Sequence, residues 1–273
     1  MPSLEPVQHG AYTLRDLNTP AERRECERIT RRCWGVDDLE IIPASALTAL
    51  QHGGNFLAGA VDANNHIVGY ALGFLSRKGN GFAYLHSHQL AVMPEHRSYG
   101  LGRALKWYQR DWCLMRGIDH VEWTFDPAQA PNANLNLEHL GAHVRHYEPD
   151  FYGELAGALA GSVATDRLVA EWPLEDERVV TKARGGQHDQ PAVGHEVRPA
   201  LAARQDGLPG EPELNLNGAV RVALPESFTN LIRDDLEAAR AWREAIRATL
   251  THYLARGYII RRYLAGGYVL FPH

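Results

Sequence analysis

The feature that most constrains this 273-residue chain is a strand that runs into a glycine turn and then an amphipathic helix. The segment from Phe82 to Val92 is rich in aromatic and aliphatic residues, and Pro94 ends it. After Gly100 the apolar residues fall at helical spacing, namely at Leu101, Leu105, Tyr108, Trp112 and Met115. The first N–H groups of a helix lack partners, and glycines let an anion approach them closely. The turn therefore predicts a site for a phosphorylated ligand.

Two other interpretations of this turn are an ordinary structural turn and a dinucleotide fingerprint. Gly100-x-Gly102 begins like Gly-x-Gly-x-x-Gly, and the acidic residues Asp119 and Glu122 lie about twenty positions further on. Leu105 occupies the position of the third glycine, however. The fingerprint also belongs to the first βαβ unit of a parallel sheet, whereas hairpin-like strands come first here. The dinucleotide alternative is therefore the weaker one.

Hydrophobic periodicity predicts a succession of strands and helices along the first two thirds of the chain. Thr19 and Glu22 form a capping box with Pro20 at the first helical position, which predicts a helix running toward Trp34. Residues 62–65 join two apolar runs in the manner of a β-hairpin. The expected strands cover residues 12–14, 56–61, 66–74, 82–92, 120–126, 142–147 and 167–172, and the expected helices cover 20–34, 43–50, 101–115 and 132–140.

The string Arg97-Ser98-Tyr99-Gly100-Leu101-Gly102 fits the pattern Arg-x-x-Gly-x-Gly. With this order of elements, the sequence resembles the GNAT superfamily of acyl-coenzyme A dependent N-acyltransferases over about residues 8–174. The resemblance implies an α+β fold, an α/β/α sandwich whose mixed, mostly antiparallel sheet is flanked by helices. It also implies that the turn wraps the pyrophosphate of coenzyme A. The residues it assigns to acyl-coenzyme A are Leu90, Ala91, Val92, Arg97, Ser98, Tyr99, Gly100, Leu101, Gly102, Arg103 and Asn132.

His86 and His88 are the candidate catalytic residues. Alternate residues of a strand project to the same face, so both imidazoles are expected to point one way, together with Leu90 and Val92. An imidazole titrates near neutrality and can take the proton that an ammonium nucleophile loses when it forms an amide. The string from His86 to Val92 is similar to the His-x-His-x-Leu-Ala-Val of arylalkylamine N-acetyltransferases, a GNAT branch in which a histidine pair relays the amine proton.

A structural histidine pair and a metal-binding pair are the alternatives to this proton relay. A His-x-His pair on a strand can ligate a metal, but a metal site needs a third ligand at a matching place. Nothing in the sequence marks one among the other histidines of this region, His120, His139, His143 and His146. No bound metal is therefore expected.

One residue that the resemblance implies is absent. In many GNAT enzymes a tyrosine protonates the departing thiolate. It lies on the helix that corresponds here to residues 132–140, and the matching position is Leu137. Tyr147 and Tyr152 are candidates from the next strand and loop, and the thiolate can also leave unassisted. The missing tyrosine keeps open a second class of function, a catalytically weak GNAT-fold protein that binds acyl-coenzyme A as a sensor or assembly module.

The acceptor is the least constrained part of the prediction. Over its whole length the sequence resembles a bacterial group of predicted GNAT proteins, some of which are associated with N-acyl and N-succinyl amino-acid metabolism. This resemblance implies acetyl- or succinyl-coenzyme A as the donor and a small primary amine, such as an amino acid, as the acceptor. Arg145 or Arg167 can bind a carboxylate by a bidentate contact, and Asp126 is a further substrate or acid–base candidate.

Composition and charge limit the remaining partners. Lysine plus arginine number 28 against 33 for aspartate plus glutamate, a net charge of −5 without a basic block, so no nucleic-acid partner is expected. Cys26, Cys33 and Cys113 fit no disulfide spacing, which is typical of a reducing compartment. The first residues do not resemble a signal peptide, and no apolar run has the length of a membrane span. A cytoplasmic location without a membrane partner is expected.

The last hundred residues change in character. Residues 175–218 are dense in glycine, proline and charge, which predicts an irregular connector with one short strand from Arg178 to Val180. Beyond it, residues 220–224 predict a strand, 228–253 one long helix, and 258–271 a closing hairpin. This β-α-β-β appendage, residues 219–273, is small for independent stability. We expect it to pack on the GNAT domain, residues 1–174, or on a second subunit of a homodimer.

Overall fold

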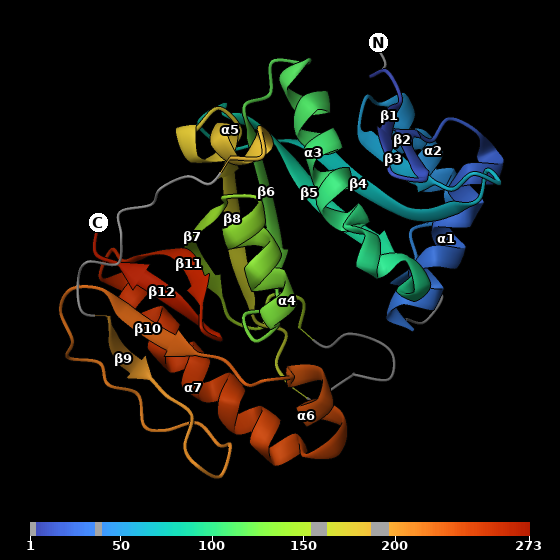
Figure 1. The fold of residues 1–273 in the computed structure, drawn as a ribbon. Coiled ribbons are helices and arrows are strands. Elements are labelled where there is room, and N and C mark those ends of the chain that lie inside the picture. The colour runs from blue at the N-terminus through green and yellow to red at the C-terminus, as the bar shows by residue number, and fades with distance from the viewer. Residues whose placement is uncertain (1–3, 36–39, 154–162, 187–196) are drawn as a thin grey trace. The chain divides into compact units, whose positions relative to one another are not determined.

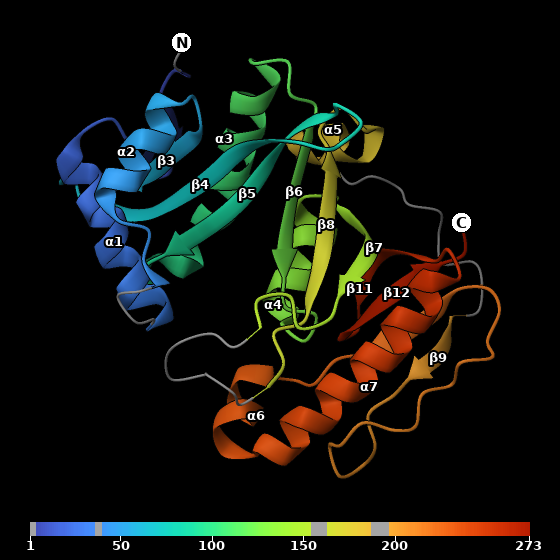
Figure 2. The same cartoon turned by 180° about the vertical axis from the view of Figure 1, so that it is seen from behind.

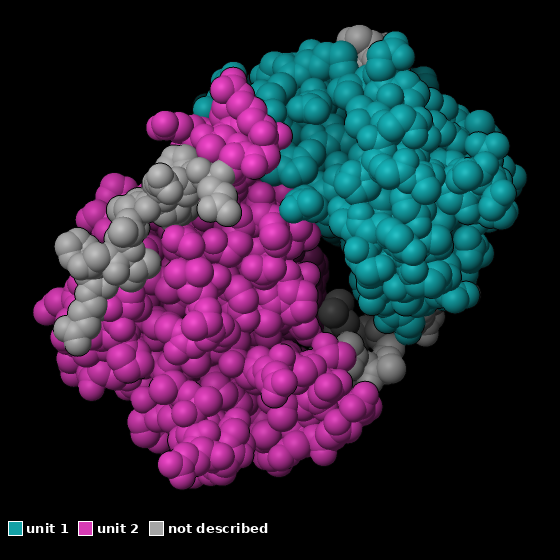
Figure 3. Space-filling model, in the orientation of Figure 1, with its two compact units in different colours: residues 1–123, 156–158, 173–175 teal, residues 124–155, 159–172, 176–273 magenta. Residues whose placement is uncertain are grey.

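The computed structural model describes residues 4–35, 40–153, 163–186 and 197–273 (Figure 1). The chain forms two compact units (Figure 3). Unit 1 comprises Met1–Trp123, Ala156–Ala158 and Pro173–Glu175, and unit 2 comprises Thr124–Leu155, Leu159–Trp172 and Asp176–His273. The division expected from the sequence, with boundaries at residues 174 and 218, stays a prediction.

Unit 1 is built on a mixed, mostly antiparallel sheet, as predicted (Figures 1 and 2). The strands follow one another in the order of the chain, and each neighbouring pair is antiparallel except the last, in which β5 and β6 run parallel. The short first strand was not predicted. The strands are β1 (Val7–His9), β2 (Tyr12–Asp16), β3 (Phe56–Val61), β4 (Ile67–Arg77), β5 (Ala83–Val92) and β6 (His120–Phe125).

Helices cover both faces of this sheet. α1 (Pro20–Trp34) and α2 (Ala44–His52) bury Ile29 and Leu47 against Tyr70 and Leu72 of β4. α3 (Leu101–Leu114) covers the other face, where the ring of Trp112 lies 5.3 Å from that of Phe56, centroid to centroid. The predicted capping box begins α1, since the Thr19 N–H donates to Glu22 Oε2 at 2.8 Å and the Glu22 N–H donates to Thr19 Oγ1 at 3.3 Å.

Unit 2 carries strands in the order β8-β7-β11-β12-β10-β9. Neighbours are antiparallel except β9 and β10, which run parallel. The long helix α7 packs against β7, β9 and β10 (Figures 1 and 2). The elements are the strands β7 (His143–Glu148), β8 (Arg167–Pro173), β9 (Arg198–Leu201), β10 (Val220–Ala223), β11 (Ile259–Leu264) and β12 (Gly267–Phe271), and the helices α4 (Ala130–Ala133), the π-helix η3 (Asn134–His139), α5 (Glu177–Ala183), α6 (Phe228–Asp234) and α7 (Leu236–Ala255).

Three local predictions for unit 2 were wrong. The strand expected from Arg178 to Val180 is part of α5, because Asp176 caps a helix there and its Oδ1 accepts from the Arg178 N–H at 2.9 Å. The connector expected to be irregular also contains β9. The single helix expected over 228–253 is divided at Asp235, which has φ −151° and ψ 86° and caps α7 with its own carboxylate. The closing hairpin was predicted correctly.

The C-terminal segment completes the sheet of unit 2, and this generates a prediction. A chain that ends at Gly218 lacks α6, α7 and three strands, and the edge of β7 loses its partner β11. We expect such a chain to aggregate or to lose cooperative unfolding, because an unpaired strand edge and the surface of β7 and β9 that α7 covers become exposed. Circular dichroism during heating tests this, and a soluble truncated protein with the melting temperature of the full chain would contradict it.

Candidate functional site

The predicted anion-binding turn is present in unit 1. Pro94–Tyr99 form one 3-10 helix, η2, and Gly100 connects it to α3 with φ 71°, a left-handed conformation that glycine adopts without strain. A methyl group built on Gly102 would meet nothing nearer than a Leu90 methyl at 3.8 Å, and one on Gly100 nothing nearer than His9 Nε2 at 3.7 Å. A Cβ at either glycine would therefore make only ordinary van der Waals contact, and the absence of side chains here leaves the backbone accessible to a ligand.

Contacts from the first two strands fix this turn. His9 Nε2 lies 2.9 Å from the Tyr99 carbonyl oxygen, and the Tyr12 hydroxyl lies 2.9 Å from His96 Nδ1. Arg97 closes the turn from the other side, since its Nε donates to the carbonyl oxygen of Val92 at the end of β5. The backbone N–H groups at the start of α3 are thereby held in one orientation.

The residues assigned to acyl-coenzyme A fall into three groups. Ser98, Tyr99, Arg97 and Arg103 are exposed around the turn, whereas Leu90 and Gly102 are half-buried beside it. Ala91, Val92 and Leu101 are buried, so only their backbone can face a ligand. Asn132 is exposed on α4 and belongs to unit 2.

A β-bulge interrupts β5 at the candidate catalytic pair. Leu72 of β4 pairs with Gln89 and Gly73 with Ser87, which leaves His88 as the extra residue. His86 and His88 share one face, as predicted, and both rings pack on Phe74, with centroids 6.5 Å and 4.9 Å from that ring. The expectation that Leu90 shares this face was wrong. Beyond the bulge the alternation is shifted, so Leu90 lies on the side of Gly102 and α3.

The surroundings keep both imidazoles in the neutral form near pH 7. His86 is half-buried and His88 is exposed, and their ring centroids are 6.1 Å apart. Desolvation lowers the pKa of each histidine, and the charge of Lys106 and the neighbouring imidazole lower it further for His86 and His88 respectively, although Glu122 acts in the opposite direction on His86. A neutral imidazole can accept a proton.

Glu122 is paired rather than available as a base. Its Oε1 accepts hydrogen bonds from His120 Nε2 at 3.1 Å and from Lys78 Nζ. Burial alone raises the pKa of this carboxyl, but these two donors outweigh burial and hold the pKa below its usual range. Glu122 therefore carries a negative charge beside the histidine strand and cannot readily take up a further proton.

Lys106 is a site residue that sequence reasoning missed. It lies on the buried face of α3, where its Nζ donates to Ser87 Oγ of β5 at 3.0 Å and to Gln109 Oε1 at 2.7 Å and lies 3.7 Å from the centroid of a Trp123 ring. Burial lowers the pKa of this lysine to about 7. Only its place in the otherwise apolar stripe of α3, between Leu105 and Tyr108, could have indicated it.

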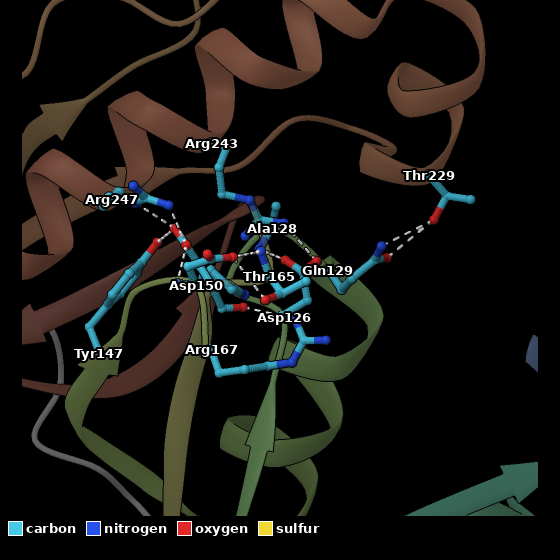
Figure 4. A network of polar contacts seen from close by, with 12 residues as sticks. Asp126, Ala128, Gln129, Tyr147, Asp150, Thr165, Arg167, Thr229, Arg243 and Arg247 are labelled. Atoms are coloured by element: carbon cyan, nitrogen blue, oxygen red, sulfur yellow. Dashed lines mark hydrogen bonds and ion pairs between the residues drawn. The ribbon is translucent and has the colours of Figure 1, made fainter. Parts of the chain in front are cut away.

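Two of the candidate substrate residues, Asp126 and Arg167, lie in a polar network of unit 2 (Figure 4). Asp126 follows β6, accepts from the Ala128 N–H at 2.8 Å, and pairs with Arg243 of α7 at 2.7 Å. Asp166 is fully buried and pairs with Arg247 of the same helix, with Nε 2.8 Å from Oδ2. No local pattern of residues predicts these two ion pairs, because the partners are 117 and 81 residues apart in the chain.

The two candidate arginines differ in their surroundings. The Arg145 guanidinium donates to Glu171 Oε2 at 2.9 Å. Burial raises the pKa of Glu171, but His143 and Arg145 outweigh it and lower this pKa to about 2. Arg167 instead donates from Nη1 to the Asp166 carbonyl oxygen at 2.8 Å, and its guanidinium carbon lies 5.0 Å from the centroid of the Tyr152 ring.

The structure also shows the surroundings of Tyr147 and Tyr152, the two tyrosines considered as proton donors. Tyr147 donates to Asp166, and burial together with this carboxylate raises the pKa of its hydroxyl far above the usual value. Tyr152 is exposed, and its hydroxyl lies 3.2 Å from Thr124 Oγ1. Leu137, where the resemblance places a tyrosine, is buried in unit 2. Within the described residues, no group of three or more His, Cys, Asp or Glu side chains is arranged to hold a metal ion.

Residues 14–142 match the Acetyltransferase (GNAT) family. This match covers the capped helix α1, the histidine strand, the glycine turn and α3. This segment is a GNAT acetyltransferase domain, the kind of domain found in acyl-coenzyme A dependent N-acyltransferases. Acetyl-coenzyme A is the acyl donor characteristic of the family, and an amine is the acceptor. A comparison with curated proteins gives no match.

Many solved structures share the fold. The ribosomal-protein-S18-alanine N-acetyltransferase from Escherichia coli is 17% identical and aligns over 59% of this chain and 93% of its own, with a TM-score of 0.47. The ribosomal-protein-S5-alanine acetyltransferase from Vibrio fischeri is 16% identical over 63% of this chain and 97% of its own, with a TM-score of 0.48. A phosphinothricin acetyltransferase from Sinorhizobium meliloti is 20% identical and aligns over 60% of this chain and 88% of its own, with a TM-score of 0.48.

The helices of the described residues include none that is both long and apolar enough to cross a bilayer.

The buried lysine predicts a pH dependence of stability. Its pKa falls from 10.5 to about 7 on folding, so between these values the unfolded chain holds more protons than the folded protein. The free energy of unfolding should therefore rise with pH through this window, by up to about 1.4 kcal/mol per pH unit. Lys106→Met should flatten this rise, which urea unfolding at pH 7 to 9.5 measures. Equal slopes for both proteins would contradict burial of Lys106.

Proposed function

We propose that the chain transfers an acetyl or succinyl group from acyl-coenzyme A to the primary amine of a small molecule, and that His86 and His88 remove the amine proton. The observation that carries this proposal is the pair of imidazoles packed on Phe74 beside the β5 bulge, where desolvation lowers the pKa of both. Amide formation from a thioester releases one proton from the nitrogen for each bond formed. A base with a pKa at or below neutrality can accept it and pass it to solvent.

The second part of the proposal assigns the pyrophosphate of coenzyme A to the backbone of residues 97–102. Gly100 and Gly102 carry no side chain that would shield the backbone, and the start of a helix such as α3 supplies N–H groups without intrahelical partners and a positive dipole end. Arg97 and Arg103 are exposed beside the turn and add positive charge for the phosphates. Tyr99, whose side chain is 57% exposed, is an apolar surface for the nucleotide.

The donor and acceptor classes are tested by incubating the full chain with acetyl-, propionyl- and succinyl-coenzyme A and a panel of small amines and amino acids, with free thiol as the readout. A peptide that begins with alanine is the competing acceptor class. Turnover of small amines supports the proposal, whereas turnover of the peptide alone overturns it. Binding of acyl-coenzyme A without turnover of any acceptor would favour the sensor or assembly role.

The glycine turn generates a prediction about binding. A Cβ on Gly102 would make only ordinary van der Waals contact and Gly102 has no left-handed backbone, so Gly102→Glu should fold while placing a carboxylate where the pyrophosphate approaches. We expect the affinity for coenzyme A, measured by isothermal titration, to fall by at least about tenfold, since like charges repel at close range. Gly79→Glu, in the turn between β4 and β5 and likewise without a left-handed backbone, is the matched control. Unchanged affinity in folded Gly102→Glu would exclude this turn.

The histidine pair generates a prediction about turnover. His86→Gln and His88→Gln should lower kcat by about 10- to 10⁴-fold and leave coenzyme A affinity nearly intact, because general-base catalysis contributes in that range. Both pKa values are lowered, so wild-type kcat/KM should fall only below about pH 6.5, where the imidazoles take up protons. The difference in kcat/KM between wild type and the variants should shrink as the pH approaches the pKa of the amine. Coinciding pH profiles for all three proteins would eliminate the relay.

A further inference from the structure

Arg167 is held in place by contacts that leave part of its guanidinium available. Its Nη1 donates to the backbone oxygen of Asp166, and the group lies over the ring of Tyr152. Arg167 forms no ion pair with a carboxylate of any residue that the structure describes. The other arginines of the network, Arg243 and Arg247, each have one. A half-buried guanidinium that has no carboxylate partner among the described residues can receive an anion.

Asp126 is fixed in the same network. The Ala128 N–H holds Oδ1 and Arg243 holds Oδ2, yet the side chain of Asp126 keeps 21% of its surface exposed. Thr124 lies two residues before Asp126, and its hydroxyl meets that of Tyr152, the ring on which Arg167 stacks. Figure 4 shows Arg167 and Asp126 in one group of polar side chains, with Arg243 reaching toward it from α7.

Arg243 itself indicates that this region is built around charge. It is 3% exposed and lies over the ring of Phe228, and its Nε and Nη1 have no hydrogen-bond partner among the residues that the structure describes. Burying a guanidinium with two unused donors costs free energy of folding. An apolar side chain at the same buried position would give a more stable protein. Its single ion pair with Asp126 keeps that carboxylate charged and in one orientation. We therefore consider Arg243 a positioning residue for Asp126.

We propose that Asp126 and Arg167 form a recognition site for a molecule that carries both an ammonium and a carboxylate group. Asp126 binds the ammonium, and Arg167 binds the carboxylate. This inference goes beyond the proposed function, because it places an amino-acid site within unit 2, and it assigns helix α7 a part in that site through Arg243. Arg145 has no such role, since Glu171 already occupies its guanidinium.

The test measures binding separately from turnover. The full chain, saturated with coenzyme A so that no acyl transfer occurs, is titrated calorimetrically with alanine, lysine and phenylalanine. For each amino acid, the amide removes the carboxylate charge and the deaminated acid removes the ammonium. We expect the amino acid to bind about 10- to 100-fold more tightly than either analogue, the range for hydrogen bonds to charged groups.

Variants assign each charge to its residue. Arg167→Gln should bring the amino acid down to the affinity of its amide, and Asp126→Asn should bring it down to that of the deaminated acid. Arg243→Lys should shift affinity in the same direction as Asp126→Asn and by less, with the carboxylate preference intact. The control is Arg240→Gln, which removes an exposed arginine of α7 paired with Glu237 and should change neither preference.

Three outcomes would overturn the inference. They are equal affinity of wild type for amino acid and amide in every series, a carboxylate preference that persists in Arg167→Gln, and a preference that Arg145→Gln removes instead. Titration with coenzyme A and succinyl-coenzyme A distinguishes the other sources of an anion. If Arg167→Gln weakens these donors and not the amino acids, the site serves the donor and the inference is wrong. Selective binding without turnover would uphold the site and count against the proposed function.

Discussion

The bulge in β5 is the constraint on which the candidate active site depends. One extra residue at His88 places the two imidazoles on the same face as Phe74 and then shifts the alternation, so that Leu90 turns toward the glycine turn. Without the bulge, residues His86, His88 and Leu90 would line a single face, and the end of the strand would present different side chains to α3. The strand can therefore serve proton transfer on one side and cofactor binding near its end.

Charge supports this strand from both faces of the sheet. Lys106 reaches Ser87 from α3, and Lys78 and His120 donate hydrogen bonds to Glu122 on the neighbouring strand. Lys106 lowers the pKa of His86 and Glu122 raises it. The proton affinity of His86 thus depends on its desolvation, which lowers the pKa most, and on these two groups of unit 1.

Local signals made most of unit 1 predictable. The capping box at Thr19, the hairpin at residues 62–65 and the glycine turn each depend on residues within a few positions of one another. The bulge was not predictable, because it is a shift in register between two strands. The alternation of apolar and polar residues along a single strand does not indicate such a shift. The predicted metal-free histidine pair and its catalytic role stay predictions. In unit 2 the sequence suggested Asp126 and Arg167, but their surroundings depend on α7, more than a hundred positions away from Asp126.

The long reach of the α7 ion pairs bears on how the chain acquires its structure during synthesis. Most of unit 1 comes from one continuous segment, Met1–Trp123, whose strands pair with their neighbours in the chain. In unit 2, β7 and Asp166 have to wait for β11 and Arg247, which the ribosome makes much later. Loop closure over such separations is slow. We therefore expect the first half of the nascent chain to collapse early, and strands β7 and β8 to remain in need of protection from aggregation until α7 and β11 have been made.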